Sequence, residues 1–123
     1  MKLHLDEFPE INVIDSYGAG SISVNRQAYS GSLLLTPDKV FTDSLPTELG
    51  GLSMALLERM AGLQPDVLLI GTGPRQLFPE AALLSALYEM NLPFETMNTP
   101  AACRSYNVLV GESRFVVALL LPA

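Results

Sequence analysis

One run of the chain leaves few folds open. Val67-Leu68-Leu69-Ile70 is entirely apolar, Pro65 stands just before it, and Gly71-Thr72-Gly73-Pro74 follows at once. A strand with apolar side chains on both faces must be covered on both faces, as parallel strands are in α/β proteins. Proline and glycine at its two ends mark where the strand begins and stops. The run therefore predicts a buried strand in a sheet that carries helices.

Segments with helical and extended patterns alternate after residue 46. Apolar residues from Leu52 to Leu63 recur at helical spacing, with Glu58 and Arg59 off that face. In residues 79–90 the same spacing places Leu84 and Tyr88 on or near the buried side. The predicted elements are, in order, a helix over 52–63, a strand over 67–70, a helix over 79–90, a strand over 94–97, a helix over 99–111 and a strand over 114–121.

The third of these helices has recognisable end signals. Thr99 is expected to cap it, and Pro100 occupies the first helical position, where its missing N–H costs nothing. Gly111 is expected to close it. Arg104 then lies about one turn into the helix, and Cys103 is beside it.

The first part of the chain, residues 1–46, predicts a meander of hairpins. Extended segments are expected over 11–17, 21–24, 28–35 and 40–42. Turns are expected at residues 25–27 and 36–39. The order of meander, α, β, α, β, α, β predicts an α/β fold with a mixed sheet and about three helices. We expect one domain over residues 1–123, with its core over about 10–121.

Composition excludes several classes of function. The net charge is −6, and the seven Lys and Arg residues are dispersed, whereas nucleic-acid binding requires a basic patch. A single cysteine forms no internal disulfide, and Met1–Glu7 resembles neither a signal peptide nor a transit peptide. The longest apolar run, 115–121, falls short of the ~20 residues of a membrane helix. We expect a cytoplasmic protein, without membrane insertion, that is a monomer or homodimer.

Two strand exits define a candidate site. If the strands over 67–70 and 94–97 are parallel, their following turns lie at the same edge of the sheet, where α/β proteins bind ligands. Glycine N–H groups and a helix N-terminus favour an anion there. The candidate ligand-binding residues are Gly71, Thr72, Gly73, Arg75, Asn98, Thr99, Cys103 and Arg104. Two alternatives stay open: the glycines serve only a tight strand exit, and Arg104 forms a salt bridge with Glu95 or Glu80.

No catalytic residue is predicted. Cys103 lies near a helix N-terminus and beside Arg104, which both lower a thiol pKa, but the only histidine is the distant His4. We interpret Cys103 as a packing residue. The chain offers no histidine or cysteine spacing for zinc and no calcium-loop pattern, so neither a metal site nor a cofactor is expected.

Four segments together resemble a known family, the MTH-nine-three-eight-like domain family. They are Asp15-Ser16-Tyr17-Gly18, Leu45-Pro46, the stretch from Pro65 to Gly73, and the stretch from Met97 to Asn107. The resemblance spans about residues 10–121. It implies a three-layer α/β fold with a mixed central sheet and an additional β layer. The family includes a mitochondrial assembly factor of respiratory complex I, which implies respiratory subunits as candidate partners.

Two functions follow from these observations. The first is a protein-interaction or assembly-factor module, suggested by the resemblance and by the missing acid–base residues. The second is a small-molecule binder, or a simple enzyme, with an anionic ligand at the shared edge of the Gly71 and Thr99 turns.

Overall fold

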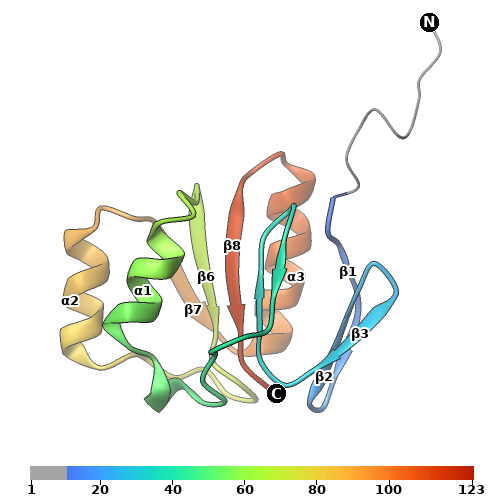
Figure 1. The fold of residues 1–123 in the computed structure, drawn as a ribbon, viewed down its shortest axis with the longest axis horizontal. Helices are drawn as coiled ribbons and strands as arrows, with labels where there is room; N and C mark the ends of the chain where they lie inside the picture. The colour runs from blue at the N-terminus through green and yellow to red at the C-terminus, as the bar shows by residue number, and fades with distance from the viewer. Residues whose placement is uncertain (1–10) are drawn as a thin grey trace, which may run out of the picture.

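The computed structural model describes residues 11–123, and a mixed five-stranded sheet lies at its centre (Figure 1). Its strands follow the order β5-β4-β8-β6-β7. Strands β8, β6 and the edge strand β7 run parallel to one another. Strand β4 is antiparallel to both β5 and β8. Their bounds are β4 Leu33–Leu35, β5 Val40–Phe41, β6 Val67–Gly71, β7 Phe94–Met97 and β8 Val116–Leu120. The predictions on Met1–Glu7 and His4 lie outside the described residues.

Alternate side chains of β6 enter two different cores. Leu68 and Ile70 pack in the core beneath α1 (Met54–Ala61) and α2 (Ala81–Glu89). Leu69 packs on the opposite face, in the core beneath α3 (Thr99–Gly111). Because both faces are covered, an uninterrupted apolar strand is stable at this position. A short 3-10 helix, η2 (Leu49–Gly51), leads into α1.

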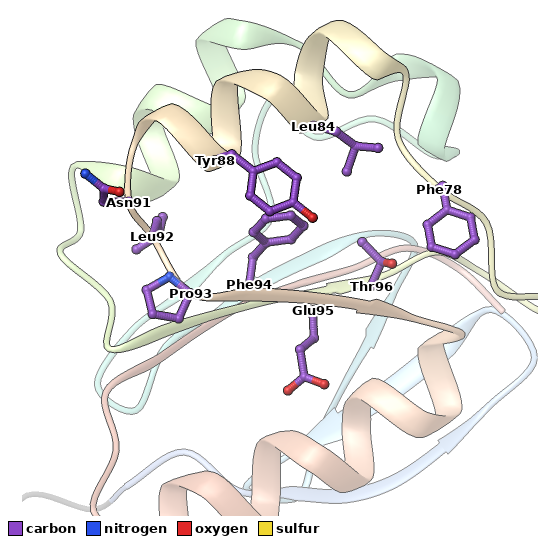
Figure 2. A pocket seen from close by; sticks show the side chains of 9 residues that line it. All are labelled: Phe78, Leu84, Tyr88, Asn91, Leu92, Pro93, Phe94, Glu95 and Thr96. Atoms are coloured by element: carbon purple, nitrogen blue, oxygen red, sulfur yellow. The ribbon is translucent and has the colours of Figure 1, made fainter.

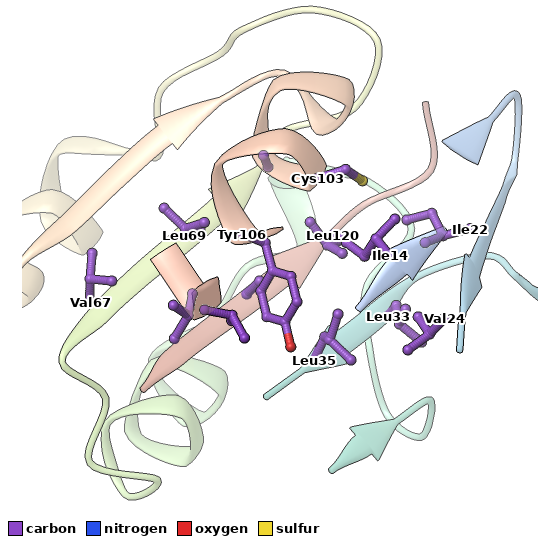
Figure 3. Close-up of a cluster of buried hydrophobic side chains, with 14 residues drawn as sticks. Ile14, Ile22, Val24, Leu33, Leu35, Val67, Leu69, Cys103, Tyr106 and Leu120 are labelled. Carbon is purple, nitrogen blue, oxygen red and sulfur yellow. The ribbon is translucent and has the colours of Figure 1, made fainter. Parts of the chain in front are cut away.

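A second sheet shares the layer of α3. It is formed by β1 (Ile14–Gly18), β2 (Ser21–Val24) and β3 (Gln27–Ser30), in the order β1-β2-β3. Ile22 and Val24 enter the same core as α3 and β4 (Figure 3). The three layers are therefore α3 with the small sheet, the central sheet, and α1 with α2, which confirms the predicted fold class.

The structure corrects three details of the sequence prediction. The expected extended segment over 28–35 breaks at Gly31, whose φ is +82°, so β3 and β4 belong to different sheets. Asn98, not Thr99, caps α3: its side chain accepts a hydrogen bond from the N–H of Ala101 at 2.8 Å. Tyr88, expected on or near the buried side of α2, is 70% exposed.

Candidate functional site

The turns after β6 and β7 meet at one edge of the central sheet, because the two strands are parallel. The N–H of Thr72 donates to the carbonyl of Met97 at 2.8 Å, and the N–H of Thr99 donates to the carbonyl of Gly73 at 2.8 Å. The hydroxyl of Thr99 accepts from the N–H of Gly73 at 2.9 Å and donates to the carbonyl of Leu121 at 2.6 Å. Thr99, which follows β7, is thus hydrogen-bonded to the residues that follow both β6 and β8.

Gly71 allows this close approach. A Cβ at that position would lie 3.0 Å from the hydroxyl of Thr99 and 3.1 Å from both its Cα and the Cβ of Ala102. Those distances are shorter than ordinary van der Waals contacts between such atoms. The first turn of α3 therefore packs directly against the backbone at the end of β6.

Several polar groups of the predicted site already have hydrogen-bond partners within the protein. The Thr72 hydroxyl donates to the carbonyl of Arg75 at 2.6 Å and accepts from the N–H of Leu77 at 3.1 Å. The Asn98 side chain is used as the α3 cap. The two turns are brought together as expected, but the N–H groups of Thr72 and Gly73 already have partners within the protein. Anion binding at these residues stays a prediction.

Cys103 faces the interior from α3. It is fully buried in the core that includes Tyr106, Ile22 and Leu120 (Figure 3). Burial raises the pKa of its thiol from 9.0 to about 11, although the nearby Arg104 guanidinium acts in the opposite direction. At neutral pH the group is a protonated thiol packed among apolar side chains, which is a poor nucleophile.

Arg104 extends toward the small sheet. Its Nη1 donates to the phenolic oxygen of Tyr17, on β1, at 2.8 Å. The ion pairs within residues 11–123 are Lys39–Asp38 and Arg59–Asp43, so Arg104 pairs with neither Glu80 nor Glu95. The guanidinium links α3 to β1. Arg75 is exposed in the loop before α2.

A cavity of about 350 Å³ opens beside the two turns. Its walls come from the β1–β2 turn, the start of α3 and the residues after β6 and β8, and include Tyr17, Ile22, Pro74, Thr99, Pro100 and Pro122. Of the predicted site residues, Thr99 contributes to this wall. Pro74, Pro100 and Pro122 also line the cavity. Their place in the wall was not predicted, because it depends on the ends of three strands coming together.

A larger groove, of about 700 Å³, lies between α2 and β7 (Figure 2). In this view Leu84 and Tyr88 descend from α2 toward Phe94 and Thr96 on β7, and Phe78 closes one end. The rings of Tyr88 and Phe94 pack edge to face, with centroids 5.3 Å apart. The groove was not predicted from the sequence, because Tyr88 was expected near the buried side of its helix. The aromatic residues near the ends of the predicted elements were the sequence feature that could have indicated it.

Within residues 11–123, no group of three or more His, Cys, Asp and Glu side chains is placed to hold a metal ion. Over the same range, no helix combines the length and the apolar character that crossing a bilayer requires.

Comparison with known proteins supports the sequence resemblance. The profile of a family described as "Protein of unknown function (DUF498/DUF598)" matches residues 14–121. The chain belongs to this family. A solution structure from Bordetella pertussis, described as a Mth938-like domain, superimposes with a TM-score of 0.78 at 32% identity, over 99% of this chain and 92% of that one. The predicted family membership is confirmed.

One further solved structure and one further sequence are also similar to this chain. A crystal structure from Bordetella parapertussis has a TM-score of 0.83 and 36% identity, covering 92% of this chain and 97% of that one. An uncharacterised protein of Rhodobacter capsulatus is 35% identical over 109 residues, which are 89% of this chain and 83% of the relative.

Two relatives carry names that bear on function. A rat protein named NADH dehydrogenase [ubiquinone] 1 alpha subcomplex assembly factor 3 is 27% identical over 99% of this chain, which spans 66% of the rat protein. A Francisella tularensis protein named 13 kDa major membrane protein is 26% identical over 85% of this chain and 86% of its own length. A cytoplasmic location for this DUF498/DUF598 family member stays a prediction.

Proposed function

We propose that this chain is a protein-interaction module of the assembly-factor type and that respiratory-complex subunits are its partners. The observation that carries the proposal is the exposure of Phe78 and Tyr88, each 70% exposed, beside the groove at the edge of the central sheet. Large exposed aromatic side chains around a hollow are typical of protein-binding surfaces. The similarity to the rat assembly factor supports the same class of function.

The test is affinity capture with a matched pair of surface variants. The tagged wild-type chain is expected to capture NADH dehydrogenase subunits from native lysate. A Phe78→Ser/Tyr88→Ser variant is expected to lose them, because it removes the apolar contacts at the groove. Val13 is 43% exposed and directly precedes β1, which lies on the opposite side of the molecule from α2 (Figure 1). The Val13→Ser variant is expected to retain the NADH dehydrogenase subunits. Equal capture by all three chains, or capture of no specific protein by the wild type, would contradict the proposal.

A second candidate function is small-molecule binding at the shared edge of the Gly71 and Thr99 turns. The observation in its favour is the 350 Å³ cavity beside them, with Arg104 bonded to Tyr17 nearby. Gly71, Thr72, Gly73, Arg75, Asn98, Thr99, Cys103 and Arg104 remain the proposed surroundings of an anionic ligand. A ligand present at 100 times its Kd would stabilise the fold by about 2.7 kcal/mol. Thermal unfolding in the presence of a panel of anionic metabolites tests this second function. If no metabolite raises the unfolding temperature, the result contradicts it.

A further inference from the structure

The backbone at the outer edge of β7 has unpaired main-chain groups. β7 is the last strand of the central sheet, and the carbonyls of Pro93 and Met97 accept hydrogen bonds from Leu68 and Thr72 on the β6 side. Main-chain groups in a parallel ladder alternate in direction, so the N–H and C=O groups of Phe94 and Thr96 point outward. Within residues 11–123 no further strand covers them. Among the described residues, only Gln76 reaches this edge: its side-chain amide donates to the carbonyl of Thr96 at 3.3 Å.

The two faces of this edge differ in chemistry. On the α2 face, Phe94 and Thr96 border the apolar groove with Tyr88 and Phe78 (Figure 2). On the α3 face, Figure 2 shows Glu95 pointing away from the groove. Glu95 is exposed and forms no ion pair with any other described residue. Arg104 lines the same shallow hollow as Glu95, but its guanidinium is bonded to Tyr17.

A second copy of this chain fits the edge poorly. In an antiparallel β7–β7 pair, the register that uses the outward groups of both Phe94 and Thr96 places Glu95 directly opposite Glu95 of the other copy. Like charges at directly opposite positions destabilise a strand pair. The net charge of −6 adds repulsion between copies. The same charges favour a partner strand that carries a cation.

We propose that the outer edge of β7 binds an extended segment of a partner protein as an additional strand, with a Lys or Arg opposite Glu95 and large apolar residues opposite Phe94 and Thr96. This inference rests on the proposed function as an interaction module and specifies its surface. Main-chain hydrogen bonds supply affinity, while the groove and Glu95 select alternate side chains. The incoming N–H replaces the Gln76 amide on the carbonyl of Thr96.

The first test uses defined peptides and fluorescence anisotropy. The probe is a capped, labelled heptapeptide whose centre is leucine-lysine-leucine, and this symmetric order serves either strand direction. Its controls are the leucine-glutamate-leucine peptide and the lysine peptide N-methylated at all three central residues. We expect the glutamate peptide to bind roughly three- to tenfold more weakly, because its charge opposes that of Glu95. The N-methylated peptide is expected not to bind.

Variants of the chain give the matching changes on the protein side. Thr96→Pro removes an outward N–H. It is expected to weaken binding of the lysine peptide at least about tenfold, which corresponds to about 1.4 kcal/mol of binding free energy. Thr96→Val keeps that N–H and is expected to bind as the wild type does. Glu95→Lys is expected to reverse the preference, so that the glutamate peptide binds more tightly. This reversal tests the proposal even if Thr96→Pro fails to fold.

Each remaining outcome has a defined meaning. Equal binding by Thr96→Pro and Thr96→Val, or an unchanged preference in Glu95→Lys, overturns the inference. Sedimentation that shows a dimer abolished by Thr96→Pro also overturns it, in favour of a second copy. If Thr96→Pro still captures NADH dehydrogenase subunits, the β7 edge is not the binding surface, while the proposed function stands. If the wild type captures none, the proposed function is wrong, and the peptide results alone decide whether the β7 edge binds a strand.

Discussion

Thr99 and Gly73 exchange two hydrogen bonds across the edge of the central sheet: the N–H of Thr99 donates to the carbonyl of Gly73 at 2.8 Å, and the N–H of Gly73 donates to the hydroxyl of Thr99 at 2.9 Å. The same hydroxyl donates to the carbonyl of Leu121. One buried side chain thereby holds together the segments after β6, β7 and β8. The predictions on stability follow from this arrangement and from the packing of α3.

Removing the Thr99 hydroxyl is expected to destabilise the fold strongly. Thr99→Val keeps the shape but leaves the buried N–H of Gly73 and the carbonyl of Leu121 without this partner, which costs about 2–4 kcal/mol. Thr99→Ser retains the hydroxyl and is expected to lose only about 1 kcal/mol, for one buried methyl group. Urea unfolding measures both. Equal stability of the two variants would show that the hydroxyl contributes little.

Gly71→Ala is expected to cost about 1–3 kcal/mol, because its Cβ would overlap the first turn of α3. Gly111 provides the control: it lies in α3, and an added Cβ would meet nothing within 4 Å. Gly111→Ala is therefore expected to be neutral or to stabilise by about 0.5–1 kcal/mol. Thermal and urea unfolding compare the pair. A Gly71→Ala chain as stable as the wild type would contradict the close contact.

Stability is expected to fall at alkaline pH through two buried acids on α3. Burial raises the pKa of the Cys103 thiol from 9.0 to about 11, and burial followed by the charge of Asp38 raises the pKa of Tyr106. Above pH 9.0 the unfolded chain loses the Cys103 proton while the folded chain keeps it. The free energy of unfolding therefore decreases as pH rises toward 11.

The variant Cys103→Ala separates the thiol contribution from that of Tyr106. It is expected to be less stable at neutral pH, because a buried side chain is shortened, but to lose less stability on going from pH 9.0 to 11. Urea unfolding at a series of pH values measures the slope. Parallel curves for the variant and the wild type would contradict the raised thiol pKa.

The small sheet is expected to depend on Asn107. Its amide accepts from the N–H of Ile14 at 2.9 Å and donates to the carbonyl of Ile14 at 2.9 Å. Asn107→Ala breaks both bonds and is expected to cost about 1–3 kcal/mol. Tyr106→Phe removes one bond, to the carbonyl of Asn12 at 2.9 Å, and is expected to cost about 1 kcal/mol. Amide exchange at Ile14 should increase more in Asn107→Ala; the reverse order would contradict this assignment.

The central layers could be predicted because their signals are local. A fully apolar strand from Val67 onward and helical spacing on either side of it are sufficient for a covered sheet. The division into two sheets could not be predicted in the same way. It depends on the left-handed backbone at Gly31 and on β4 pairing with β8, which is far away in the sequence.

The candidate sites were predictable only in part. Parallel strands bring the Gly71 and Thr99 turns together, as expected, but a sequence does not say that Thr99 bonds to Gly73 and Leu121. The exposure of Tyr88 has a similar origin. Its helical position suggests a place near the buried side, yet α2 lies at the edge of the sheet, and within residues 11–123 no strand beyond β7 covers that ring.

The most direct test of the interaction surface is amide hydrogen exchange, measured by NMR on the isotopically labelled chain with and without the lysine-centred peptide. Phe94 and Thr96 point their N–H groups outward, whereas those of Glu95 and Met97 already bond to β6. An added strand should therefore slow exchange at Phe94 and Thr96 and leave Glu95 and Met97 nearly unchanged. Unaltered exchange at Phe94 and Thr96 with the peptide bound would contradict binding at the edge of β7.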